Sequence, residues 1–113
     1  MKLEQARQFA LSLPETTEEP HFNYTSFRVK GKIFATAPPG GGHLNIFVDE
    51  ELRDPLIASD PEIYAPLPWG ARVVGVQVTL AKANPTTVKR LLAACWTRKA
   101  PKRLAADTKL ALD

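Results

Sequence analysis

Apolar side chains recur at two different spacings along the chain, and each spacing predicts a type of element. The first helix is predicted over residues 2–13, where four apolar side chains lie three or four positions apart, namely Leu3, Ala6, Ala10 and Leu13. Pro14 is expected to end this helix. Apolar and polar positions then alternate through SFRVK, as in a half-buried strand, and after the tight turn predicted at Gly31 the KIFATA segment is expected to return as the second strand of a hairpin.

Proline and glycine mark the loops. Residues 14–25 are mostly polar and include Pro14 and Pro20, so we expect a loop there. The PPGGG segment at residues 38–42 predicts a flexible loop, and the alternating HLNIFV segment after it predicts a third strand. These glycines do not indicate a phosphate-binding loop, because strands are expected on both sides and no Gly-Lys-Ser/Thr sequence follows.

A proline also complicates the next helix. Asp49 can cap a helix that begins directly after it, but Pro55 lacks the backbone N–H that a helix interior needs. The pattern leaves two alternatives. Either the helix begins at Pro55 with Asp54 as its cap, or it begins after Asp49 and is kinked.

The C-terminal half carries the clearest strand and the clearest helix. An irregular edge strand is predicted within the proline-rich residues 60–70. The strand predicted for RVVGVQVTL has one apolar face, formed by Val74, Val76, Val78 and Leu80. Asn84 followed by Pro85 is a strong start signal for a helix. The buried face of that helix is predicted to contain Val88, Leu91, Leu92 and Cys95.

These elements predict a single α+β domain over residues 1–113, in the order α-β-β-β-α-β-β-α, with an antiparallel sheet packed by helices. One more helix is expected within residues 103–112, and the tail at residues 105–113 is expected to fray. The 113 residues are 44% hydrophobic and 24% charged, which is sufficient for one hydrophobic core and excludes a disordered chain.

The expected compartment follows from the cysteine count and from the N-terminus. Cys95 is the only cysteine, so an internal disulfide is excluded. Glu4 and Arg7 interrupt the apolar run that a signal peptide would need, and no segment reaches the roughly eighteen apolar residues of a membrane span. We therefore expect a cytoplasmic protein without a membrane partner.

The sequence contains no catalytic or metal-binding pattern. His21 and His43, the two histidines, have no second ligand at metal-binding spacing. Cys95 lies on a predicted apolar face, where a buried thiol is inert. No Gly-x-Ser-x-Gly turn is present either. We expect no enzymatic activity, no metal and no cofactor.

Positive charge is concentrated in the second part of the chain. Residues 1–60 carry six Lys/Arg against nine Asp/Glu, a net of −3, and residues 61–113 carry nine against three, a net of +6. Such asymmetry fits a phosphate-bearing or acidic partner, with solubility as the alternative. The candidate nucleic-acid-binding residues are Arg28, Lys30 and Lys32 at the hairpin tip, and Arg98, Lys99, Lys102 and Arg103 after the last main helix. Four ring-bearing side chains, His21, Phe22, Tyr24 and Phe27, precede the hairpin and could stack on bases, although Phe27 fits the core better.

Four segments, LPETTEE, SFRVKGKIFAT, LNIFVDEELRDPLIASDPEIY and LLAACWTRKAPKRLA, together resemble the MmcQ/YjbR family of small bacterial proteins. The resemblance covers residues 1–105. It implies a compact α+β fold similar to type III secretion chaperones and to the frataxin-like CyaY arrangement. It also implies a DNA-binding role, because family members are compared with a double-wing shape, and no catalytic residues belong to the family pattern.

The sequence departs from this family at two places. Val73–Val74 stand where members often carry a Gly-Trp pair, so Trp69 would have to replace that aromatic ring in space, and Pro55 interrupts a helix that is usually continuous. Two functions are expected. The first is a DNA-binding module that contacts phosphates through the two basic clusters. The alternative is a chaperone-like, protein-binding adaptor that uses a sheet edge or an apolar patch near Trp69.

Overall fold

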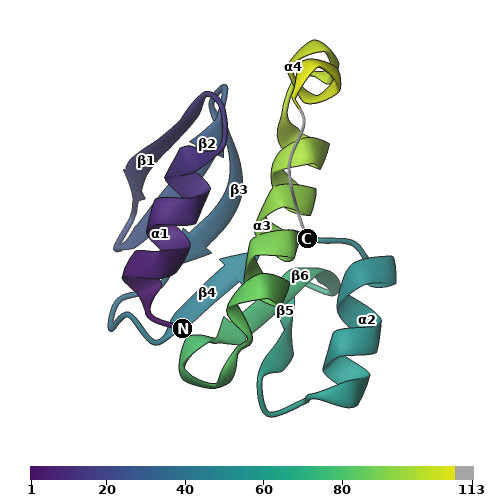
Figure 1. Ribbon diagram of the computed structural model, residues 1–113. Helices are drawn as coiled ribbons and strands as arrows, with labels where there is room; N and C mark the ends of the chain where they lie inside the picture. The colour runs from purple at the N-terminus through teal and green to yellow at the C-terminus, as the bar shows by residue number, and fades with distance from the viewer. Residues whose placement is uncertain (109–113) are drawn as a thin grey trace.

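The computed structural model describes residues 1–108. It contains a six-stranded antiparallel sheet with helices packed on one face. The strands are β1 (Thr16–His21), β2 (Tyr24–Val29), β3 (Lys32–Ala37), β4 (His43–Ile46), β5 (Tyr64–Trp69) and β6 (Arg72–Thr79). The helices are α1 (Leu3–Ser12), α2 (Glu50–Ser59), α3 (Pro85–Lys99) and α4 (Lys102–Asp107), with a 3-10 turn at Leu80–Lys82. The strand order is β1-β2-β3-β4-β6-β5, and Figure 1 shows α1 and α3 in front of the sheet. The predicted α+β class is confirmed.

The hydrophobic core lies between this sheet and the helices α1 and α3. Its strand side chains share one face of the sheet and include Phe27, Val29, Ile46, Val76 and Val78. The predicted apolar face of α3 is buried against them, and Trp96 beside it is fully buried. The indole of Trp96 donates a hydrogen bond from Nε1 to the carbonyl of Pro14, at 3.0 Å, so the largest core side chain also has its polar atom satisfied.

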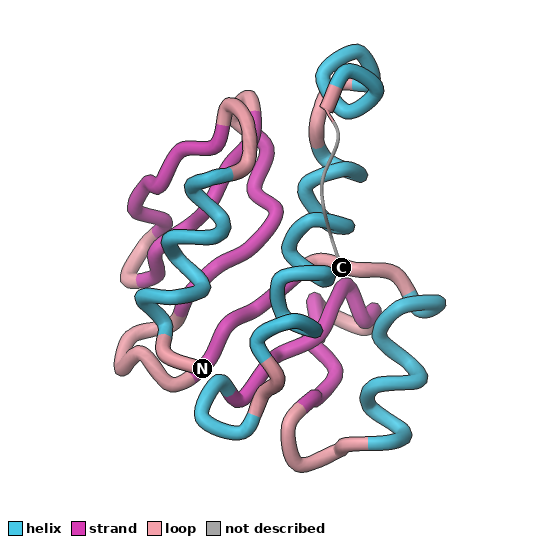
Figure 2. Tube along the Cα trace, in the orientation of Figure 1, coloured by secondary structure: helices cyan, strands magenta, loops and turns pink. Residues whose placement is uncertain are grey.

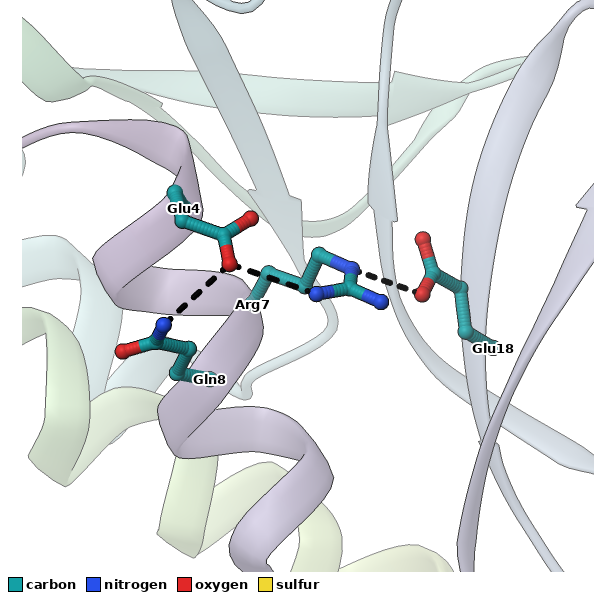
Figure 3. A network of polar contacts seen from close by, with 4 residues as sticks. All are labelled: Glu4, Arg7, Gln8 and Glu18. Atoms are coloured by element: carbon teal, nitrogen blue, oxygen red, sulfur yellow. Dashed lines mark hydrogen bonds and ion pairs between the residues drawn. The ribbon is translucent and has the colours of Figure 1, made fainter.

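Charged side chains hold α1 against the edge strand β1 (Figure 3). Arg7 donates from Nε to Oε1 of Glu18 at 2.8 Å and from Nη1 to Oε2 of Glu4 at 3.3 Å. Gln8 donates to the same Glu4 oxygen at 3.2 Å. These contacts, led by the hydrogen bond to Glu18, raise the pKa of Arg7. The network fixes the position of an edge strand that has a hydrogen-bonded neighbour on one side only.

The loop predicted for residues 14–25 is wrong, because this segment contains β1 and a tight turn into β2. Residues 17–20 are all exposed, so the strand has no buried face and shows no apolar alternation. Pro20 is tolerated because an edge strand leaves half of its backbone groups unpaired.

The helix α2 begins at Glu50 and continues through Pro55. The alternative that placed its start at Pro55 is therefore wrong. None of its residues is buried, so water can satisfy the carbonyl that the proline leaves without a donor.

The start of α3 is as predicted, since Oδ1 of Asn84 accepts hydrogen bonds from the backbone N–H of Thr86 and Thr87.

The last predicted helix begins at Lys102 and ends at Asp107, and positions 109–112 of that prediction lie outside the described residues. Within residues 1–108, no helix combines the length and the hydropathy needed to cross a membrane.

A β-bulge changes the direction of Val74. Leu67 pairs with Gly75 and Pro68 with Val73, so Val74 has no partner in the ladder. Its predicted place on the core face is wrong, whereas Val76 and Val78 are buried as expected.

Candidate functional site

A row of polar side chains crosses the open face of the sheet, the face away from α1 and α3. Thr36 pairs with Asn45, and Asn45 pairs with Gln77, so the three side chains lie on the same face of neighbouring strands. The amide of Gln77 donates to Oδ1 of Asn45 at 3.2 Å, and the amide of Asn45 donates to Oγ1 of Thr36 at 3.2 Å. Thr36 and Asn45 are buried. The row is therefore an ordered polar floor rather than a solvated surface.

The first hollow above this floor, which we call the aromatic hollow, has a volume of about 420 Å³. Thr36 and Asn45 line its base, and Phe22, Tyr24 and Trp69 line its sides. Phe22 belongs to the β1–β2 turn, and Trp69 is the last residue of β5, next to the β5–β6 turn. Since β1 and β5 are the two opposite edges of the sheet, the sheet must curve strongly for both turns to reach one hollow.

Phe22 and Trp69 are unusually exposed for aromatic side chains. Phe22 is 93% exposed and Trp69 is 74% exposed. Phe22 also has a φ of 58°, in the left-handed region that a bulky residue rarely adopts. Its ring contacts His21 edge-on, with the ring centroids 4.9 Å apart. Backbone strain of this kind concentrates at functional sites, so the turn is a candidate binding element.

A second hollow adjoins the first and contains the positive charge. This basic hollow has a volume of about 880 Å³ and shares His21, Phe47, Trp69 and Val74 with the aromatic hollow. Its cationic side chains are Arg53, Arg72, Arg98 and Lys99, and its acidic side chains are Asp49 and Glu50. Four cations against two carboxylates leave a net charge of +2 around one opening.

The four cations differ in how firmly they are held. Arg53 donates from Nη1 to the carbonyl of Val48 at 3.0 Å and pairs with Asp54 at 3.4 Å. Arg72, Arg98 and Lys99 make no ion pair with another of the residues that the structure describes. Their charges are therefore available to an anion that enters the hollow.

Cys95 lies beneath this end of α3 and is buried, as predicted. Its Sγ shares its hydrogen between the carbonyl oxygens of Phe34, at 3.0 Å, and Phe47, at 2.6 Å. Burial raises the pKa of the Cys95 thiol to about 12, against the opposing effect of nearby Lys99. A thiol held neutral in this way is not poised for nucleophilic attack. No group of three or more potential metal-ligating side chains occurs within residues 1–108.

Comparison with known proteins shows the family to which this fold belongs. A model of the YjbR family matches residues 11–98, which is most of the chain. The chain belongs to the YjbR family. The crystal structure of the Deinococcus radiodurans protein DR2400, with the family domain DUF419, is similar to this YjbR domain with a TM-score of 0.73 and 22% identity, over 85% of this chain and 76% of that chain. This likeness shows the shared fold. No curated protein matches the sequence.

Within this YjbR domain, the predicted basic residues lie in different environments. Of the predicted C-terminal cluster, Arg98 and Lys99 line the basic hollow. Lys102 and Arg103 are exposed on α4, which Figure 2 shows beyond the end of α3 and clear of the sheet.

The hairpin-tip cluster does not line either hollow. Arg28 donates from Nε to Oγ of Ser26 at 3.0 Å, and Lys30 pairs with Glu15 at 3.2 Å. Lys32 is exposed at the start of β3.

Sequence reasoning missed Arg53, Arg72 and the polar row. Arg72 follows a Gly-Ala turn, and nothing in the local pattern relates it to Arg98. Asn45 occupies a polar position of the predicted third strand, which was a detectable signal for an ordered floor residue.

Proposed function

We propose that this YjbR domain is a non-catalytic nucleic-acid-binding module, with DNA as the expected ligand, that holds phosphates through cationic side chains at the basic hollow. The observation that carries the proposal is the convergence of Arg72, Arg98 and Lys99, none of them in an ion pair with another described residue, around one opening. Cations gathered on one face release condensed counterions when they neutralise phosphates, and this release supplies most of the sequence-independent affinity.

The predicted residues outside the hollow have a secondary place in this proposal. Arg28, Lys30, Lys32, Lys102 and Arg103 would contact phosphates further along the same ligand. Lys30 must first leave Glu15, and Arg28 must leave Ser26. We therefore assign most of the phosphate affinity to Arg72, Arg98 and Lys99.

A protein-binding adaptor is the second candidate, and exposed Phe22 and Trp69 favour it. The two edge strands of the sheet do not favour a protein partner. β1 exposes Glu18 and Glu19, and β5 exposes Pro66 and Pro68. Charges and prolines on edge strands discourage the addition of a partner strand. The net positive charge beside the aromatic rings also fits a phosphate polymer better than an apolar peptide.

The test compares two double variants of equal charge. Arg98→Ala/Lys99→Ala removes two cations from the basic hollow, and the control Lys82→Ala/Lys89→Ala removes two exposed cations outside it. Affinity for a fluorescently labelled mixed-sequence DNA is measured by anisotropy between about 50 and 200 mM salt. We expect the first variant to bind more weakly for every sequence. Its log–log salt slope should fall by about 0.7–0.9 for each lost contact, while the control keeps nearly the parent slope. Equal binding by both variants, or no binding by the parent at the lowest salt, would contradict the proposal.

A further inference from the structure

We infer that the nucleic acid held by this site is single-stranded, with an unpaired base stacked on Phe22 and Trp69 in the aromatic hollow while its backbone phosphates lie in the basic hollow. The inference rests on the proposed function and specifies its ligand. The chemistry named here is common to single-stranded DNA and RNA.

The exposed apolar side chains gather at the two hollows. The large hydrophobic residues that the structure describes as exposed are Phe22, Tyr24, Leu52, Trp69 and Val73. All of them except Leu52 line one of the two hollows. Aromatic rings beside a cationic groove bind the faces of unpaired bases, and this stacking is tolerant of sequence. In a duplex those faces are already stacked on neighbouring base pairs, so a duplex could not use them.

The polar floor offers hydrogen-bonding groups at the base of the aromatic hollow. The amide nitrogen of Asn45 carries two hydrogens, and one of them is used on Thr36. The hydroxyl of Thr36, which lines the same hollow as Asn45, has a hydrogen to donate and a second lone pair to accept. These two side chains offer both donors and acceptors to the edge of an unpaired base. A hollow of about 420 Å³ also falls within the usual range of small-molecule sites, about 300–1,000 Å³.

The two hollows adjoin at Trp69, which lines both of them. Arg72 is three residues from Trp69, in the same β-turn, and pairs with it in the ladder. Trp69 lines both hollows, so a base on its ring places the adjoining phosphates beside Arg72. The strain at Phe22 supports the same assignment, because a glycine would fill this turn more easily and would lack the ring.

The test begins with the affinities for three labelled probes of the same sequence, about 16 nucleotides long: single-stranded DNA, single-stranded RNA and duplex DNA. We expect at least one of the single strands to bind about tenfold or more tightly than the duplex. Trp69→Leu should weaken single-strand binding by roughly 5- to 100-fold, and Trp69→Phe should keep most of it. Leu52→Ala, an exposed apolar change outside both hollows, is the matched control and should bind as the parent does.

Phe22→Gly separates a binding role from a structural one. We expect weaker single-strand binding together with an unchanged or higher melting temperature.

In the parent protein, the fluorescence emission of Trp69 should be quenched when the single strand binds, while Trp96 is fully buried and contributes a constant background.

The two proposals fail in different ways. Equal binding of duplex and single strand, unaffected by Trp69→Leu but weakened by Arg98→Ala/Lys99→Ala, overturns the single-strand inference and keeps the proposed function. Absence of binding to every probe at about 50 mM salt overturns both. The relative affinities for the DNA and RNA strands decide which of the two is the ligand.

Discussion

At the scale of single residues, Phe22 and Cys95 lie at opposite extremes of exposure. Phe22 is almost completely exposed and its backbone is strained. Cys95 is completely buried and its thiol is held by two backbone carbonyls. The strained backbone at Phe22 lowers the stability of the fold and places an aromatic ring at the surface. The buried thiol of Cys95 contributes to stability and performs no chemistry at the surface. Both have measurable consequences.

Phe22→Gly is expected to stabilise the fold or leave it unchanged. The left-handed backbone costs a bulky residue about 1–2 kcal/mol, and the entropy of an added glycine cancels about 0.5–1 kcal/mol of that gain. The net increase in the free energy of unfolding should therefore lie between about 0 and about 1.5 kcal/mol, measured by urea denaturation. Lys30→Gly, at another left-handed position outside both hollows, is the matched control and should behave alike. A clear loss of stability in Phe22→Gly alone would mean that the ring packs against the fold.

Cys95 should make the protein less stable at alkaline pH. Burial raises the pKa of its thiol from 9.0 to about 12 in the folded state. The stability that this group contributes is complete below its unfolded pKa, and it is lost between about pH 9 and about pH 12, where only the unfolded thiol ionises. Between about pH 8 and about pH 10 the loss should be about 1.4 kcal/mol.

The measurement compares the parent with Cys95→Ala. The variant should be less stable by about 1 kcal/mol or somewhat more at the lower pH, as for a small core truncation, and the difference should shrink or reverse at the higher pH. Tyr64, whose pKa is also raised by burial, affects both proteins equally and cancels in the comparison. A difference that does not change with pH, or rapid labelling of the native thiol by DTNB, would contradict this account.

At the scale of elements, the approach of β6 to the end of β4 depends on one glycine. Gly75 lies so close to that strand that an added Cβ would meet the carbonyl oxygen of Ile46 and lie 2.9 Å from Cα of Phe47. Both obstacles are backbone atoms, which cannot move aside as a flexible side chain can. The same region carries the bulge that directs Val74 toward the hollows.

Gly75→Ala should therefore be strongly destabilising, by about 3 kcal/mol or more. Gly42→Ala is the control, because Gly42 has no neighbour within 4 Å of an added Cβ and no left-handed φ. Chemical denaturation of both variants measures the difference. A cost for Gly75→Ala as small as that for Gly42→Ala would show that the two strands can separate without penalty.

At the scale of the whole molecule, the curvature of the sheet brings its two edge strands, β1 and β5, toward the same hollow. The β1–β2 and β5–β6 turns come from opposite edges and line one hollow, so the candidate site exists only when the complete sheet is formed. α3 spans this arrangement, since Trp96 contacts Pro14 and Cys95 contacts Phe34 and Phe47.

We predict that the chain unfolds as one domain. In Trp69→Phe the remaining tryptophan, Trp96, reports on the core, and its fluorescence should change at the same urea concentration as the far-ultraviolet circular dichroism. Coincident transitions are expected because a single core of this size unfolds in an all-or-none manner. Two separate transitions would show that the β1–β3 and β4–β6 parts are independent.

The elements whose signals are local could be predicted from the sequence. α3 is an example, because Asn84, Pro85 and the apolar spacing of the helix act within one stretch of chain. β1 could not be predicted in this way. An edge strand that buries no side chain has no alternation to detect, and its backbone pairing depends on β2.

The candidate site was likewise only partly predictable from the sequence. Phe22, Trp69, Arg98 and Lys99 could be noticed as aromatic or basic residues in the sequence, but nothing in their positions relates them to one another. Their meeting depends on sheet order and curvature, which arise from packing between segments far apart in the chain. The sequence by itself thus determined α1, α3, most strands and the α+β class, because short-range periodicity and capping encode them. Only the tertiary structure decided the edge strand β1, the direction of Val74 and the two hollows, because these depend on contacts between distant residues.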